Sequence, residues 1–222
     1  MTKPAALLLD LDGTLLESER LWLIAEHNIM SRYGYAWTVE DQHHCLGGPL
    51  DRVADYMELH INGVQRSEII GQDLLDEVAS LFVSEPLEWR PGAHELVAQA
   101  HELGIKTAIV TASWRSLLDT VIVRMSESVG AFTFSVAGDE VENSKPHPQP
   151  YLSAAAALGA PINECLAIED SPTGTLSAVR AGAKVVAVAH MAPIDVPGAY
   201  VLDTLEGHSV ESLWKIVNNR LK

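Results

Sequence analysis

Near the start of the chain stands the run Ala5-Ala6-Leu7-Leu8-Leu9-Asp10-Leu11-Asp12-Gly13-Thr14, in which an apolar stretch ends in two acids, a glycine and a threonine. A short, nearly continuous apolar run is typical of a strand that is covered on both faces in a parallel sheet. Gly13 allows the chain to turn sharply just past such a strand. The sequence therefore predicts a buried first strand over residues 5–11 that presents Asp10 and Asp12 at its carboxyl end.

Similar apolar runs recur along the rest of the chain, and helical patterns separate them. The further runs are Lys106–Thr111, Phe134–Ala137, Cys165–Glu169 and Lys184–Ala189. The helical patterns are His94–Leu103, Tyr151–Leu158 before Gly159, and a helix with Ser171 as N-cap and Pro172 as first residue that runs to Ala181 before Gly182. Glycine after a helix and Ser-Pro before one are the usual end signals. The alternation predicts a Rossmann-like, doubly wound α/β domain with a parallel sheet.

One long segment breaks this alternation. Residues 16–86 show helical periodicity but no strand pattern, and they contain four Arg, no Lys and thirteen acidic residues. We interpret this segment as a small all-helical cap domain that is inserted after the first strand and acts as a lid. The predicted domains are thus a discontinuous catalytic core, residues 1–15 and 87–222, and a cap, residues 16–86.

The amino-acid composition limits which classes of partner and which cellular compartment are expected. The 222 residues carry a formal net charge of −15, which argues against nucleic acid, because proteins bind that polyanion largely through Lys and Arg. No apolar run approaches the roughly 18 residues that span a bilayer, so no membrane partner is expected. Two cysteines make a disulfide scaffold implausible and favour the cytoplasm. The sequence carries no prediction of oligomeric state.

Polar residues follow the apolar runs at the places where the strands should end. Thr111-Ala112-Ser113 follows the second run, Lys145 precedes a helix, and Glu169-Asp170-Ser171-Pro172 closes the fourth run. Ligands of open α/β sheets bind at the carboxyl ends of the strands, so these side chains and the first acidic turn should share one crevice. Arg115 is a further candidate for that site.

This set of side chains suits phosphoryl transfer. A carboxylate such as Asp10 can attack phosphorus and form an aspartyl phosphate, and a second acid such as Asp12 can protonate the leaving oxygen and later activate water. Lys145, Thr111 and nearby backbone N–H groups can neutralise and hold the phosphate oxygens. Several acids close together need a hard cation among them, and Mg²⁺ prefers oxygen ligands.

The sequence resembles the haloacid dehalogenase (HAD) superfamily of phosphatases, in the branch with a helical cap after the first motif. The matching motifs, in family order, are Asp10-Leu11-Asp12-Gly13-Thr14, Val110-Thr111-Ala112-Ser113, Lys145-Pro146 and Glu169-Asp170-Ser171-Pro172 with Gly174. The resemblance implies that Asp10 is the nucleophile and Asp12 the general acid/base. It also implies phosphate binding by Thr111, Ala112, Ser113 and Lys145, and Mg²⁺ binding by Asp10, the backbone carbonyl of Asp12, and Asp170, with support from Glu169.

Several chemistries remain to be separated within and beyond this resemblance. Asp12 argues against a dehalogenase, which has no leaving oxygen to protonate, and the lysine-free segment argues against phosphonate cleavage through a cap Schiff base. A phosphosugar mutase of the β-phosphoglucomutase type shares all four motifs, but Trp22 stands about where its cap histidine falls. A signalling receiver domain has its acceptor Asp before the Thr, and none precedes Thr111. Hydrolysis of a small phosphorylated metabolite such as a sugar or polyol phosphate is the main prediction. The phosphosugar mutase stays the first alternative, and a non-catalytic binding module on the same fold is the less favoured one.

Overall fold

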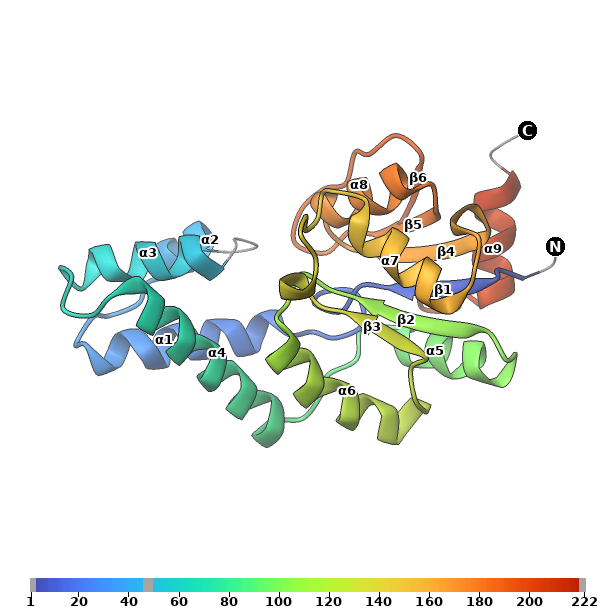
Figure 1. Cartoon of the computed structure of the whole chain (residues 1–222). Helices are drawn as coiled ribbons and strands as arrows, with labels where there is room; N and C mark the ends of the chain where they lie inside the picture. Colours follow the sequence, from blue (N-terminus) through green and yellow to red (C-terminus); the bar gives the residue numbers. More distant parts are fainter. Residues whose placement is uncertain (1–2, 46–49, 220–222) are drawn as a thin grey trace. The chain divides into compact units, whose positions relative to one another are not determined.

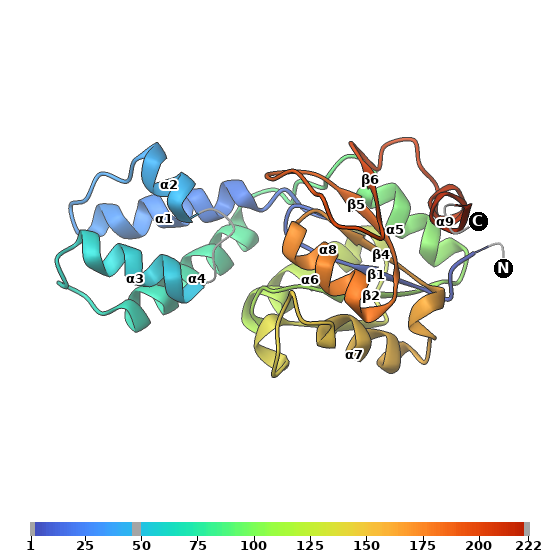
Figure 2. The same ribbon diagram turned by 90° about the horizontal axis from the view of Figure 1, so that it is seen from above.

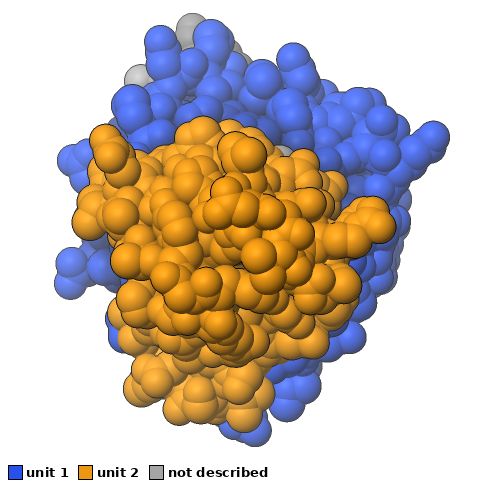
Figure 3. Space-filling model, turned by 90° about the vertical axis from the view of Figure 1, so that its left-hand side faces the viewer, with its two compact units in different colours: residues 1–17, 87–222 blue, residues 18–86 orange. Residues whose placement is uncertain are grey.

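The computed structural model describes residues 3–45 and 50–219, and it divides the chain into two compact units (Figures 1 and 3). Unit 1 comprises Met1–Glu17 and Leu87–Lys222, and unit 2 comprises Ser18–Pro86. Unit 1 holds all the strands of the described chain, whereas unit 2 is helical. None of the described helices is both long and apolar enough to span a membrane.

The described part of unit 1 is built on a six-stranded, fully parallel sheet with the order β3-β2-β1-β4-β5-β6. The strands are β1 (Ala6–Leu9), β2 (Lys106–Val110), β3 (Phe134–Val136), β4 (Cys165–Glu169), β5 (Lys184–Val188) and β6 (Ala199–Leu202). The sheet confirms the predicted doubly wound α/β fold. The sequence analysis did not single out β6, a four-residue edge strand that is only partly buried.

Helices cover both faces of this sheet (Figure 2). On one face lie α7 (Gln149–Leu158) and α8 (Pro172–Ala181), and on the other lie α5 (Ala93–Glu102) and α9 (Val210–Asn219), with α6 (Arg115–Val129) packed beside α5. The predicted helix signals are confirmed at α8, where the Ser171 hydroxyl oxygen accepts a hydrogen bond from the Gly174 N–H at 3.0 Å and Gly182 closes the helix with a φ of +90°.

The strand order creates a switch point at the centre of the sheet. The chain proceeds from β2 outward to β3 on one side of β1 and from β4 outward to β5 and β6 on the other. β1 is completely buried between β2 and β4, so the turn that follows it emerges between the ends of those two strands. A crevice at such a reversal is the usual ligand site of an open α/β sheet.

Unit 2 consists of α1 (Glu19–Arg32), α2 (Val39–Cys45), α3 (Leu50–His60) and α4 (Ser67–Ser84). Both α1 and α3 pack on α4, and their apolar faces meet in a small core that includes Ile29, Met57, Ile70, Leu74 and Val78. Unit 2 thus has a core of its own, as an inserted domain requires. Its role as a cap stays a prediction.

A buried acid in unit 2 gives a testable pH dependence. Glu26 is 5% exposed and accepts a hydrogen bond from the Trp37 indole N–H at 3.1 Å. Burial raises the pKa of Glu26 from 4.5 to about 7, so the folded protein keeps a proton there that the unfolded chain releases. The free energy of unfolding should therefore fall as pH rises through this window, by at most about 3 kcal/mol for this one group.

We expect Glu26→Gln to remove this contribution, since a glutamine oxygen can still accept from Trp37 but carries no charge. The variant should match the wild type near pH 5 and be more stable at pH 8. Urea unfolding followed by tryptophan fluorescence at both pH values measures the difference, with Glu40→Gln at an exposed site as the control. Identical pH dependence in the wild type and Glu26→Gln would show that Glu26 does not titrate on unfolding.

Candidate active site

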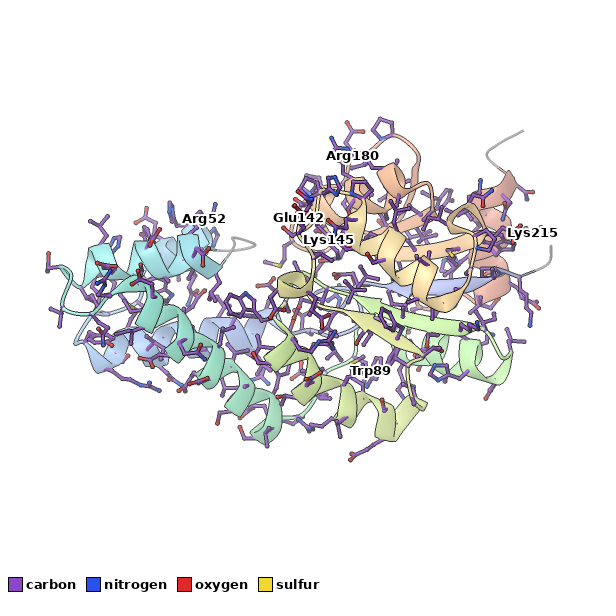
Figure 4. All side chains as sticks on the ribbon, in the orientation of Figure 1. Arg52, Trp89, Glu142, Lys145, Arg180 and Lys215 are labelled. Carbon is purple, nitrogen blue, oxygen red and sulfur yellow. The ribbon has the colours of Figure 1, made fainter. Side chains whose placement is uncertain are left out.

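Lys145 lies at the centre of the candidate site. Its side chain is 5% exposed, and its ammonium group donates to Asp10 Oδ1 at 2.6 Å and to Glu169 Oε1 at 2.5 Å. Asp10 directly follows β1 and Glu169 ends β4. Lys145, which is labelled in Figure 4, precedes α7. Burial alone would lower the pKa of Lys145, but the two carboxylates outweigh it and raise that pKa, so the ammonium stays charged. Residues from three separate segments thus form one buried charged group.

Glu169 is held by donors on every side. The Tyr151 hydroxyl donates to Oε1 at 2.7 Å, and Oε2 accepts from the Asp170 N–H and from the Ser171 hydroxyl at 3.2 and 3.1 Å. A Cβ at Gly174 would stand 1.9 Å from Oε1, so only glycine lets the first turn of α8 approach this carboxylate. The fully buried Tyr151 was missed as a site residue, because a tyrosine within a helical pattern gives no signal beyond core packing.

Asp170 joins the turn after β1 to the end of β4. The Thr14 hydroxyl donates to Asp170 Oδ1 at 3.0 Å. Gly13 has a φ of +80°, and a Cβ there would stand 2.2 Å from Asp170 Oδ2. Glycine is therefore required at this position both for its backbone conformation and for the close approach of the carboxylate.

Asp10, Glu169 and Asp170 form a buried group of acids whose oxygens could share one cation. One carboxylate oxygen from each lies within 4.8 Å of the others. Burial raises the pKa of Asp10 to about 7 and that of Asp170 to about 8, and the neighbouring carboxylates add to both shifts. Among the described residues, no donor reaches Oδ2 of Asp10 or of Asp170. Two such oxygens beside a third acid are a donor set that fits a hard divalent cation such as Mg²⁺.

The Asp12 carboxylate lies apart from this group. Its Oδ2 accepts hydrogen bonds from the Ser113 hydroxyl at 2.6 Å and from the Thr111 hydroxyl at 3.3 Å. The Ser113 N–H in turn donates to Thr111 Oγ at 2.9 Å. The two acids after β1 therefore have different surroundings, Asp10 beside an ammonium and Asp12 beside two hydroxyls, while Ala112 between those hydroxyls is exposed.

Arg115, a candidate for the site from the sequence, is engaged by side chains outside the acidic group. Its guanidinium binds Glu140 and donates to Asp119 Oδ1 at 3.2 Å and to Ser135 Oγ at 2.9 Å. Arg115 is the first residue of α6, and its partners lie within that helix (Asp119), in β3 (Ser135) and between β3 and α7 (Glu140). These contacts join α6 to β3 and to the segment that follows β3, and the guanidinium is paired with two carboxylates.

A histidine that the sequence analysis did not single out borders the acidic turn. His190 Nε2 lies 3.1 Å from Glu17 Oε1, and its Cδ2 lies 3.2 Å from the position of a Cβ at Gly13. Arg90 forms an ion pair with the same Glu17 side chain at 2.5 Å. His190 comes two residues after β5, so the inspection of strand ends that found the other residues could also have found this one.

Comparisons with known proteins show what the chain as a whole is similar to. The family model described as haloacid dehalogenase-like hydrolase matches residues 7–188. Hexitol phosphatase B of Escherichia coli is 32% identical over 179 residues, which are 79% of each chain. Protein CbbY of Rhodobacter capsulatus is 33% identical over 189 residues, which are 82% of this chain and 83% of that protein. The crystal structure of CbbY from Rhodobacter sphaeroides in complex with phosphate superposes with a TM-score of 0.82 at 25% identity and covers 95% of this chain and 99% of that chain.

Proposed function

The chain belongs to the haloacid dehalogenase-like hydrolase family and is a phosphatase of that family, and from this premise we propose that it hydrolyses a small phosphomonoester through a phosphorylated Asp10. The observation that carries the proposal is the buried Lys145 ammonium, which contacts both Asp10 and Glu169 at the switch point of the sheet. A cation is needed there because the chain as a whole is strongly negative and would repel a phosphate.

The residues of the site would divide the reaction into two displacements. An oxygen of Asp10 attacks phosphorus while the bond to the leaving oxygen breaks, and Asp12 gives its proton to that oxygen. Asp12 then takes a proton from water as the water oxygen attacks phosphorus and the bond to Asp10 breaks. The products are an alcohol and inorganic phosphate, and Asp10 and Asp12 return to their starting states.

The phosphate oxygens would be bound by Lys145, by the Thr111 hydroxyl and by the turn that contains Ala112 and Ser113. Mg²⁺ would be held by Asp10, the backbone carbonyl of Asp12, and Asp170, with Glu169 in support, and it would neutralise charge on the transferring group. Fixed cations of this kind stabilise the charge that spreads over the phosphate oxygens in the transition state.

We further propose a sugar or polyol phosphate as the substrate. This choice is supported by the names of relatives that cover about four fifths of the chain, among them a hexitol phosphatase. The helical unit, which lacks lysine, would serve as the cap that recognises the leaving group. A panel of sugar, polyol, nucleotide and aryl phosphates tests the proposal, and absence of phosphate release from every member with Mg²⁺ present would refute it. Formation of glucose 6-phosphate from β-glucose 1-phosphate would identify a mutase instead.

Metal dependence gives a second prediction. We expect a chelator to abolish phosphate release and added Mg²⁺ to restore it, because the buried acids repel an anionic substrate without a cation among them. Asp170→Asn should raise the Mg²⁺ concentration needed for half-maximal activity by about tenfold or more, whereas Asp203→Asn at an exposed site of the same unit should not. Full activity in the presence of chelator would contradict the assigned metal site.

A further inference from the structure

Ser113 was predicted to bind phosphate, but its hydroxyl is already engaged. Ser113 Oγ donates to Asp12 Oδ2 at 2.6 Å. A serine hydroxyl carries one proton, so it cannot donate to Asp12 and to a phosphate oxygen at the same time. The Thr111 hydroxyl has the longer contact with the same oxygen, 3.3 Å, and stays the hydroxyl proposed to bind phosphate. We propose that Ser113 is a positioning residue for Asp12, which fixes the oxygen that carries the transferred proton; this role rests on the proposed function of Asp12 as general acid.

The backbone around Ser113 is held from both sides, which makes its hydroxyl a fixed donor. Its N–H donates to Thr111 Oγ at 2.9 Å, and its carbonyl accepts from the Gly138 N–H at 2.8 Å. A Cβ at Gly138 would stand 2.1 Å from the Ala112 carbonyl oxygen, so a glycine is required for this close contact. The next turn is tied as well, since the Arg115 N–H donates to Asp139 at 2.8 Å. Ser113 thus belongs to a turn whose backbone is held in place by these hydrogen bonds.

The bond to Asp12 has a consequence for proton transfer. A neutral carboxylic acid has one carbonyl oxygen, which accepts hydrogen bonds, and one hydroxyl oxygen, which donates. Because Ser113 donates to Oδ2 and Thr111 contacts the same atom at 3.3 Å, Oδ2 is the accepting oxygen. In the proposed role the transferred proton is on Oδ1, from which it passes to the leaving oxygen as the bond from phosphorus to that oxygen breaks.

This role predicts a dependence on the leaving group. An alkyl phosphate leaves as a strongly basic alkoxide unless it is protonated, whereas p-nitrophenyl phosphate leaves as a stable phenolate that needs no acid. A residue that positions the acid should matter for the first substrate and hardly at all for the second. A residue that binds the transferred phosphate should matter equally for both, since the phosphate group is the same.

The test compares kcat/KM for two substrates: the sugar or polyol phosphate that the panel finds best, and p-nitrophenyl phosphate. This quantity reports the steps up to the transfer of the phosphoryl group to Asp10. In Ser113→Ala we expect a loss of about 10- to 100-fold for the alkyl phosphate, and a change of no more than about threefold for the aryl phosphate. Ser113→Thr keeps a hydroxyl and should preserve the wild-type ratio of the two values. Inhibition by inorganic phosphate should be unchanged in Ser113→Ala.

Equal losses for both substrates, together with weaker inhibition by phosphate, would overturn the proposal and assign Ser113 to phosphate binding. The ratio of the two kcat/KM values is measured on one sample, so partial unfolding of a variant cannot imitate the expected result. Asp12→Asn tests the role of Asp12 separately from the role of Ser113. If Asp12 is the general acid, this variant should favour the aryl over the alkyl phosphate even more strongly than Ser113→Ala does. If Asp12→Asn shows no such preference, the proposed function of Asp12 fails before that of Ser113.

Discussion

Replacement of Asp10 by asparagine is expected to reduce kcat by at least about 10⁴-fold, because the variant loses the oxygen that would bond to phosphorus. The amide keeps the size of the side chain and is uncharged, and burial already raises the pKa of Asp10 to about 7, so the variant should fold. Phosphate release from the best substrate of the panel, together with a thermal unfolding curve, measures both effects.

Asp203→Asn is the matched control for this experiment, since Asp203 is an exposed acid in the same unit. The control should keep wild-type activity. Beryllium fluoride, which imitates a phosphoryl group on an aspartate, should bind the wild type and Asp203→Asn but not Asp10→Asn. Turnover within tenfold of wild type in a folded Asp10→Asn protein would remove Asp10 from the role of nucleophile.

Lys145→Met is expected to have the second-largest effect, and it should affect both activity and stability. The substitution removes the one ammonium that contacts Asp10 and Glu169 within the described site, and it leaves these carboxylates buried without their cation. Removing one partner of a buried ion pair typically costs about 3–5 kcal/mol of unfolding free energy. Loss of a fixed charge from the phosphate site should also lower kcat/KM by about 10²- to 10³-fold.

Urea unfolding and the phosphatase assay measure these two losses separately. Lys215→Met is the control. Lys215 is exposed on α9, and Figure 4 shows it well apart from Lys145. The double variant Lys145→Met with Glu169→Gln should recover part of the stability, because one buried carboxylate is neutralised, but none of the activity. Wild-type stability in Lys145→Met would show that the charged group is not a structural requirement of the fold.

The inner strands of the sheet could be read from the sequence because they are covered on both faces. Residues 6–9 are all completely buried, so selection for apolar side chains at each position leaves a continuous signal. The same reasoning fails for β6, where only Ala199 is buried and the strand pairs on one side.

The charged part of the site was predictable for a different reason. Asp10, Glu169 and Asp170 stand at the ends of strands, and a parallel sheet brings such ends together whatever the loops between them do. Distances between side chains do not follow from that rule. The contact of Ser113 with Asp12 and that of Tyr151 with Glu169 depend on rotamers and on the course of a turn and a helix, which strand order does not determine.

The proposed reaction passes the phosphoryl group through Asp10 on its way to water, and the stereochemical course at phosphorus distinguishes this route from direct attack by water. Each in-line displacement inverts the configuration at phosphorus. Hydrolysis of an isotopically chiral phosphomonoester should therefore proceed with overall retention, because two displacements occur, one by Asp10 and one by water. Overall inversion would mean that water attacks the substrate directly, and it would contradict a phosphorylated Asp10.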